Sequence, residues 1–354
     1  MNARKKVFII LLSVFVFLVA AVGSSAYFLL LHRYKGTAIV DEWRVDKTFD
    51  PSAVRTLKKT KGKDLVILNL ADVQMCDLED IPHYSIIHDE LTYLVETVKP
   101  DLITLTGDQT WSNENLISLK TLIGWLDGYK IPYAPVFGNH DHGNDYDSAV
   151  AGINYCCDLY ENGKYSLFSR GPSNLGALGN YVIAVEEDGV IVNAIYMLDA
   201  GYTDVLTDEQ IAWVRWNADG LKNACGGEYL PSLCFMHKPV PEFGRAYYSF
   251  INGESTAIGP VSVHYSLSGT VQNGFFSMAK EIGVTDIVCG HQHGNDFTIE
   301  YEGVRLTFAL KTGELGGYYG DEEVYLNGAS AFKVNGASVV KENVYVEKEK
   351  YGIE

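Results

Sequence analysis

Short apolar runs rich in branched side chains alternate with helix-like segments in the first part of the folded region. Such runs indicate buried strands, which are predicted at 65–70, 102–105 and 133–137. Helices are predicted after these strands, at about 84–98, 114–126 and 148–159. Strands that alternate with helices of this length are typical of parallel βαβ units.

The second part of the chain has a different pattern, dominated by hairpins. Two predicted strands, 181–185 and 190–198, flank Glu186-Glu187-Asp188-Gly189, which is a hairpin signal. Thr207 and Gln210 form a predicted capping box at the start of a helix. The remaining predicted elements are strands at 233–236 and 286–289, a helix at 275–282, and hairpin turns at 302–303 and 335–336. Parallel units followed by hairpins predict two sheets packed together, with helices outside.

The N-terminal segment has no polar face at all. Arg4, Lys5 and Lys6 precede an apolar run from Val7 to Leu31, which as a helix would be roughly 37 Å long and could cross a bilayer. The predicted organisation is a cytoplasmic basic leader (1–6), a transmembrane signal-anchor (7–31), a juxtamembrane stalk (32–62) and a folded domain outside the cytoplasm (63–354). The alternative is a secreted protein whose signal peptide is cleaved near Ser24-Ser25-Ala26.

Composition narrows the range of partners. The 354 residues carry a formal charge of -17 with a pI near 4.9, which argues against a nucleic-acid partner. An acidic protein that binds phosphorylated substrates needs local positive charge, and bound metal ions would supply it. The six cysteines permit disulfides outside the cytoplasm, for example between Cys225 and Cys234. The sequence specifies neither the pairing nor the oligomeric state.

Five short polar blocks follow predicted strands. They are Asp72-Val73-Gln74, Gly107-Asp108, Gly138-Asn139-His140-Asp141, His237 and Gly290-His291-Gln292-His293. Their carboxylates, amide oxygens and imidazoles are ligands for divalent metals. Because ligands bind beyond the carboxyl ends of the strands in open α/β sheets, these blocks can converge on one edge and hold two metal ions.

These blocks, in this order, resemble those of the calcineurin-like metallophosphoesterase superfamily, most of all its purple-acid-phosphatase-like branch. Asn180-Tyr181-Val182, Leu198-Asp199-Ala200-Gly201-Tyr202 and Met236-His237-Lys238-Pro239 extend the resemblance, which covers roughly residues 64–320. It implies an α/β fold, a four-layer αββα sandwich of two mixed sheets. It also implies a metal-dependent phosphoester hydrolase (a phosphatase) that acts on a phosphorylated small molecule or another phosphoester. In that family a metal-bridging hydroxide attacks phosphorus in line with the leaving group.

The resemblance also implies a role for each polar residue. Asp108 would bridge two divalent ions, which the sequence leaves open as manganese, zinc or iron. The first ion would be bound by Asp72 and His293, with Gln74 as a further candidate ligand. The second ion would be bound by Asn139, His237 and His291. His140 would lie beside the phosphate, oriented by Asp141.

Two positions depart from the family pattern. Gln74 stands where the family often has histidine, and its amide oxygen is a weaker metal ligand. Trp111 stands where the purple enzymes have a tyrosine that binds ferric iron, so a purple ferric centre is not expected. Two other functions stay open for this chain. One is a phosphodiesterase or nucleotide pyrophosphatase on the same metal core, and the other is a catalytically dead ligand-binding ectodomain.

Two further side chains lie close to the polar blocks in the sequence. His142 is interpreted as a surface residue of its loop, with a role in the site as the alternative. Asp296 is interpreted as solvated, with orientation of a ligand histidine as the alternative.

Overall fold

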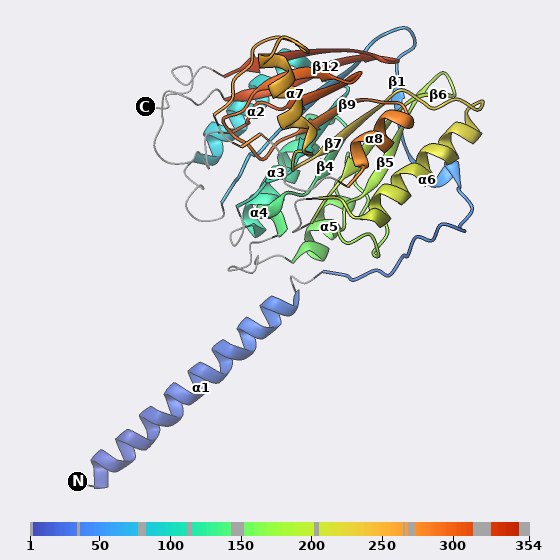
Figure 1. The fold of residues 1–354 in the computed structure, drawn as a ribbon. Coiled ribbons are helices and arrows are strands. Elements are labelled where there is room, and N and C mark those ends of the chain that lie inside the picture. Colours follow the sequence, from blue (N-terminus) through green and yellow to red (C-terminus); the bar gives the residue numbers. More distant parts are fainter. Residues whose placement is uncertain are drawn as a thin grey trace.

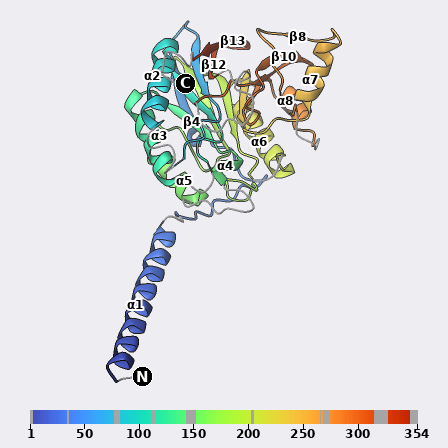
Figure 2. The ribbon, with the colours of Figure 1, turned by 90° about the vertical axis from the view of Figure 1, so that its left-hand side faces the viewer.

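The computed structural model describes residues 3–33, 36–76, 83–111, 115–142, 152–201, 205–264, 266–267, 273–313 and 327–346. Two mixed sheets lie face to face, and helices cover the outer face of each (Figures 1 and 2). This is the predicted four-layer arrangement. An N-terminal helix, α1 (Ala3–Arg33), lies apart from the two sheets.

The five-stranded sheet has the order β13-β12-β2-β3-β4. Its strands are β2 (Leu65–Leu70), β3 (Leu102–Thr106), β4 (Tyr133–Val136), β12 (Gly328–Asn335) and β13 (Ser338–Tyr345). The first three are parallel to one another, as the βαβ pattern predicted, and β12 joins β2 in antiparallel orientation. Its outer helices are α2 (Tyr84–Val98), α3 (Leu116–Tyr129) and α5 (Ile153–Glu161). The predicted start of the helix at 148–159 lies outside the described residues.

The eight-stranded sheet has the order β1-β5-β6-β7-β9-β11-β10-β8. Its strands are β1 (Arg55–Lys59), β5 (Tyr181–Glu187), β6 (Val190–Leu198), β7 (Ser232–Met236), β8 (Thr256–Ala257), β9 (Val284–Cys289), β10 (Phe297–Tyr301) and β11 (Val304–Phe308). Its outer helices are α6 (Asp208–Ala224), α7 (Glu242–Ile251) and α8 (Phe275–Glu281). The capping box of α6 is present, because Thr207 accepts from the Gln210 backbone and Gln210 accepts from Thr207.

The alternation of side chains along the central strands explains why both faces of the larger sheet are covered. On β7, Leu233 and Phe235 belong to the core between the sheets, whereas Cys234 and Met236 belong to the core under the outer helices. Successive residues of a strand point to opposite faces, so an unbroken apolar run fills two cores at once.

The predicted stalk is not a separate segment. Residues 55–59 form β1, which pairs in parallel with β5 at the edge of the larger sheet. Trp43 is buried and packs edge-on against Trp216 of α6, with ring centroids 6.2 Å apart. Lys59, which lies in the predicted stalk, is buried and forms an ion pair with Glu187. These packed residues lie within the predicted stalk, and a single polar-rich strand at a sheet edge has a weak sequence signal.

Two other predictions concern the N-terminus and the cysteines. Within the part of the chain that the structure describes, no helix combines the length and apolar character that a membrane crossing requires, so the predicted transmembrane helix is not supported. All six cysteines, including Cys225 and Cys234, are free thiols.

Candidate metal centre

The predicted ligands meet at one edge of the molecule. They follow the carboxyl ends of five strands, β2, β3 and β4 of one sheet and β7 and β9 of the other. Two groups of ligand atoms form there, each with all its atoms within 4.8 Å of one another. The first comprises Asp72, Asp108 and His293, and the second comprises Asp108, His237 and His291. Asp108 belongs to both groups, as a bridging carboxylate must.

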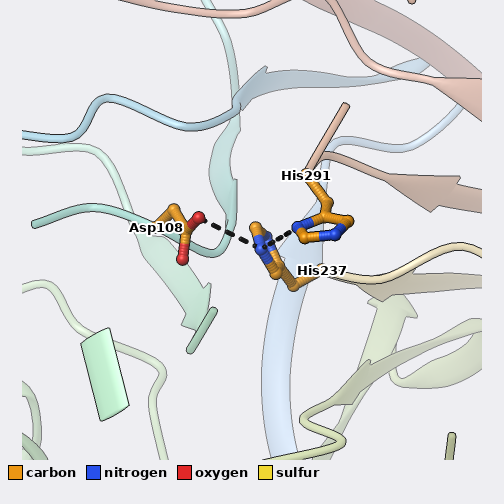
Figure 3. A group of neighbouring side chains, drawn as sticks. All are labelled: Asp108, His237 and His291. Carbon is orange, nitrogen blue, oxygen red and sulfur yellow. Dashed lines mark hydrogen bonds and ion pairs between the residues drawn. The ribbon is translucent and has the colours of Figure 1, made fainter. Parts of the chain in front are cut away.

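The second group is centred on the His237 ring (Figure 3). Its Nε2 lies 3.2 Å from Asp108 Oδ2, 3.0 Å from Asn139 Oδ1 and 3.1 Å from His291 Nδ1. The opposite ring atom, Nδ1, lies 2.9 Å from the Thr106 carbonyl oxygen. When the ring is neutral, as metal binding requires, an Nδ1–H donated to that carbonyl leaves the Nε2 lone pair directed at the group. The group thus brings together two imidazole nitrogens, a carboxylate and an amide oxygen. This donor set suits zinc, iron or manganese.

The first group is more deeply buried. His293 Nε2 lies 3.3 Å from Asp72 Oδ1, and the Asp72 carboxylate also accepts a hydrogen bond from the His291 backbone N–H. The Gln74 side chain is only 1% exposed, and neither its Nε2 nor its Oε1 has a hydrogen-bond partner among the described residues. A buried amide without partners costs about 1–3 kcal/mol, which coordination of a metal by Oε1 would offset. The donor set therefore fits a second cation.

Backbone strain is concentrated at this edge. Asp72, Gln74, Asp108 and His291 all have positive φ, between 50° and 70°. A non-glycine residue in the left-handed region costs free energy and persists only where the surroundings fix it. The fold thus holds four site residues in conformations that turn their side chains toward one another.

Two glycines make room for the carboxylates. A Cβ on Gly138 would lie 2.2 Å from Asp108 Oδ1, and one on Gly290 would lie 2.4 Å from Asp72 Oδ2. Only glycine lets the backbone approach these acidic side chains so closely.

The electrostatics of the group follow from burial and mutual contact. Burial alone would raise the pKa of Asp108, but the charge and hydrogen bond of His237 hold that pKa well below its usual range. The same contact outweighs burial at His237 and raises its pKa to about 9. Burial and the charge of His237 lower the pKa of His291 to about 4. The buried Asp108 carboxylate thus attracts positive charge, which the His237 ring supplies here.

His140 lies at the rim of the site. Its backbone N–H donates to Asp108 Oδ1 at 2.8 Å, and its ring Nε2 is 3.9 Å from Asp108 Oδ2. The ring stacks on Trp111, with centroids 4.1 Å apart and an interplanar angle of 17°. Burial lowers the pKa of His140.

The Asp141 carboxylate is held by the backbone of two loops. Its carboxylate accepts from the backbone N–H groups of Gly138 (2.9 Å), Thr110 (2.9 Å) and Gln109 (3.3 Å), and from the Thr110 hydroxyl (3.0 Å). These hydrogen bonds join the loop after β3 to the short helix α4 (Asn139–His142) and do not reach the His140 ring. Asp141 therefore positions the backbone of both loops. Burial, then the charge of Asp108, raises the pKa of Asp141 to about 7.

Two residues expected at the surface are buried. His142 Nε2 lies 2.7 Å from Asp199 Oδ2, which connects α4 to the loop after β6. Asp296 forms a buried ion pair with Lys341 of β13 at 2.9 Å and also accepts from Asn343. Both pairs join one sheet to the other. Asp199 had no role assigned from the sequence, although its place directly after a buried strand was a usable signal.

The comparisons with known proteins agree with this geometry. Residues 48–295, more than half of the chain, match the calcineurin-like phosphoesterase family. The chain belongs to the calcineurin-like phosphoesterase family. The family acts on phosphorylated substrates and uses a dinuclear metal centre, for which this calcineurin-like phosphoesterase has two candidate ligand groups.

Curated relatives of this calcineurin-like phosphoesterase differ in their described activity. "Probable inactive purple acid phosphatase 29" of Arabidopsis thaliana is 25% identical over 62% of this chain and 61% of its own length. "Phosphatase DCR2" of Saccharomyces cerevisiae is 24% identical over 76% of this chain and 49% of its own length. The chain thus spans about half to three fifths of these relatives. A dimetal phosphatase from Danio rerio aligns in structure with a TM-score of 0.48 and 12% identity, over 79% of this chain and 99% of its own.

Proposed function

We propose that this chain is an active metal-dependent phosphoester hydrolase that prefers phosphomonoesters as substrates. The observation that carries the proposal is the convergence of His237 Nε2, His291 Nδ1 and Asn139 Oδ1 on the Asp108 carboxylate, which also belongs to the Asp72 group. A purely structural metal site has no need of a carboxylate shared by two ligand groups or of an extra histidine at its rim.

The chemistry divides between the metals and the chain. A pair of divalent ions, when bound, lowers the pKa of water and polarises phosphoryl oxygens. Asp108 holds the two ligand groups together, and Asp141 fixes the loops that carry Asp108 and Asn139. His140 lies beside this centre with its pKa lowered by burial, so the neutral ring predominates near pH 7. Its single N–H can donate a hydrogen bond to a substrate oxygen, either on the transferring group or on the leaving group.

Hydrolysis of p-nitrophenyl phosphate and bis-p-nitrophenyl phosphate, with manganese, zinc or iron added, tests the proposal. We expect turnover of the monoester, and a loss of at least 100-fold in kcat for Asp108→Asn, the size of effect that removal of one key electrostatic group produces. Asp46→Asn, which removes a carboxylate exposed in the segment before β1, is the matched control and should keep full activity. Preference for the diester would instead support the phosphodiesterase or nucleotide pyrophosphatase alternative.

A ligand-binding ectodomain without activity is the second candidate. The observations that favour it are Gln74 in place of a histidine and the description of several plant relatives as probably inactive. Metal binding without turnover of either ester, for any of the three metals, would support this candidate and contradict ours.

The cellular location is a separate proposal that rests on the sequence. Residues 7–31 would anchor the chain, with the phosphoesterase domain outside the cytoplasm; secretion after cleavage is the alternative. Support comes from the apolar run behind Arg4, Lys5 and Lys6, and from exposed apolar side chains on α1, such as Ile10, Phe15 and Phe17. Alkaline extraction of membranes tests it: an anchored chain stays in the pellet, and a chain released to the supernatant contradicts anchoring.

A further inference from the structure

We propose that Trp111 is an aromatic platform that receives a planar leaving group, so that this site prefers aryl phosphoesters, in which the leaving oxygen is bonded directly to an aromatic ring. The inference rests on the proposed hydrolase function and names a substrate class for it. No ligand role follows for Trp111 from the metal chemistry, because an indole cannot bind a divalent cation.

The first step is the exposure of the Trp111 ring. All five tryptophans of the chain lie in the described residues, and Trp111 is the one whose side chain is exposed, at 38%. The residues just before it, Asp108 to Thr110, are each 1% exposed. The chain therefore emerges from the interior at Trp111 and presents a large apolar ring directly at the rim of the metal centre. An exposed aromatic ring directly beside the candidate metal ligands offers a bound ligand an apolar surface to stack on.

The second step is the fixed position of the ring. The Trp111 backbone N–H donates to the Met75 carbonyl at 2.9 Å, and Met75 pairs with Thr110 in a parallel bridge. The indole plane lies nearly parallel to the His140 ring at 4.1 Å. Backbone and ring contacts together hold the indole in place, so little side-chain entropy remains to be lost when a ligand binds.

The third step is the order of groups from the metal centre outward. Asp108 Oδ2 lies 3.9 Å from His140 Nε2, and the indole lies on the face of the same imidazole. If His140 hydrogen-bonds to the leaving oxygen, the group attached to that oxygen lies within reach of the indole. An aromatic ring there gains stacking or edge contact with Trp111, whereas a short alkyl group does not. A neutral ring also adds no repulsion in a chain of formal charge -17.

The experiment compares phenyl phosphate with ethyl phosphate on the metal-loaded full chain. The quantity is the ratio of kcat/KM for the two esters in each variant, divided by the ratio in the wild type, so that intrinsic reactivity cancels. We expect Trp111→Leu to lower this ratio by roughly three- to tenfold, the size of one aromatic pair, and Trp111→Phe to preserve it. Trp125→Leu is the matched control. Trp125 of α3 packs on His88 of α2, with ring centroids 5.0 Å apart, so this variant should leave the ratio unchanged.

A binding measurement separates failure of this inference from failure of the proposed function. Phenylphosphonate and ethylphosphonate are not hydrolysed, and their affinities for the metal-loaded chain can be measured by calorimetry. We expect Trp111→Leu to weaken phenylphosphonate by the same factor and to leave ethylphosphonate unchanged. Equal loss for both esters and both phosphonates would show that Trp111 only supports His140, and would overturn the platform. A wild type that binds phosphonates but turns over neither ester would refute the hydrolase function instead.

Discussion

At the scale of single residues, the site combines groups that the sequence identified with groups that only the fold reveals. The candidate ligands could be predicted because each is a polar residue directly after a buried strand, and strand ends share an edge. The contacts of Asp141 with Gln109 and Thr110 could not be predicted, because these residues lie in the loop after β3, 32 and 31 residues away. His142 and Asp296 were misplaced for the same reason: their partners, Asp199 and Lys341, are distant in sequence.

Replacing Gln74 should change protein stability in opposite directions without and with metal. Without metal its buried amide has no hydrogen-bond partner among the described residues, so Gln74→Leu should stabilise the metal-free protein by about 1 kcal/mol. In the presence of manganese or zinc the same variant should lose most of the metal-induced rise in Tm. Thermal unfolding with and without chelator measures both effects.

The control for Gln74 is another buried glutamine. Gln109 donates to the Val136 carbonyl at 2.8 Å, so Gln109→Leu should destabilise the protein with or without metal. A Gln74→Leu protein that is less stable than the wild type in chelator would contradict a ligand role for Gln74.

At the scale of elements, the metal centre is built from loops of both sheets, so the position of one sheet relative to the other must be fixed. The His142–Asp199 pair does this at the centre itself, because α4 follows β4 of the smaller sheet and Asp199 follows β6 of the larger. Asp199 is in turn held by Asn180, whose side-chain oxygen accepts a hydrogen bond from the Asp199 backbone N–H at 3.1 Å.

The pH dependence of this pair has a definite sign. Burial would lower the pKa of His142, but Asp199 outweighs burial and raises it above the ordinary value of 6.5. The stabilisation by the charged pair is therefore complete below about pH 6.5 and is lost as pH rises through the raised pKa. We expect Asp199→Asn to cost about 2 kcal/mol in the free energy of unfolding at pH 6, and less at pH 9.

Chemical denaturation across this pH range, on wild type and Asp199→Asn in parallel, provides the check. Asp188→Asn, in a turn where the side chain is exposed and pairs with Lys61, should show no such trend. A cost for Asp199→Asn that grows with pH would mean that the pair is not charged in the folded protein.

The packing of the segment before β1 can also be tested at this scale. A flexible stalk would tolerate any substitution, whereas a packed segment would not. Trp43→Ala should destabilise the protein by about 3 kcal/mol, because a buried indole is removed from its contact with Trp216. Val45→Ala, at a side chain that is 77% exposed, should leave the denaturation midpoint unchanged. Equal midpoints for the two variants would restore the stalk interpretation.

At the scale of the whole molecule, the strand–helix pattern predicted the two-sheet architecture well, because a buried parallel strand and an amphipathic helix each have a strong local signal. The edge strand β1 and the helix α7 were missed. The first is polar and short, so its signal is weak; the second begins directly after Pro241, where the proline was a usable helix-start signal. The net charge of -17 also bears on the proposed function, because an acidic protein repels an anionic phosphoester. Metal ions bound at the shared edge would supply the local positive charge that such a substrate needs.

The central claim is that Asp108 joins two cation sites, and anomalous scattering from crystals of the metal-loaded protein tests it most directly. The claim predicts two anomalous peaks, one between Asp108, His237 and His291 and one between Asp108, Asp72 and His293. In crystals of Asp108→Asn we expect at least one of the two peaks to be lost. A single peak that Asp108 does not contact, or no peak at saturating manganese or zinc, would contradict the claim.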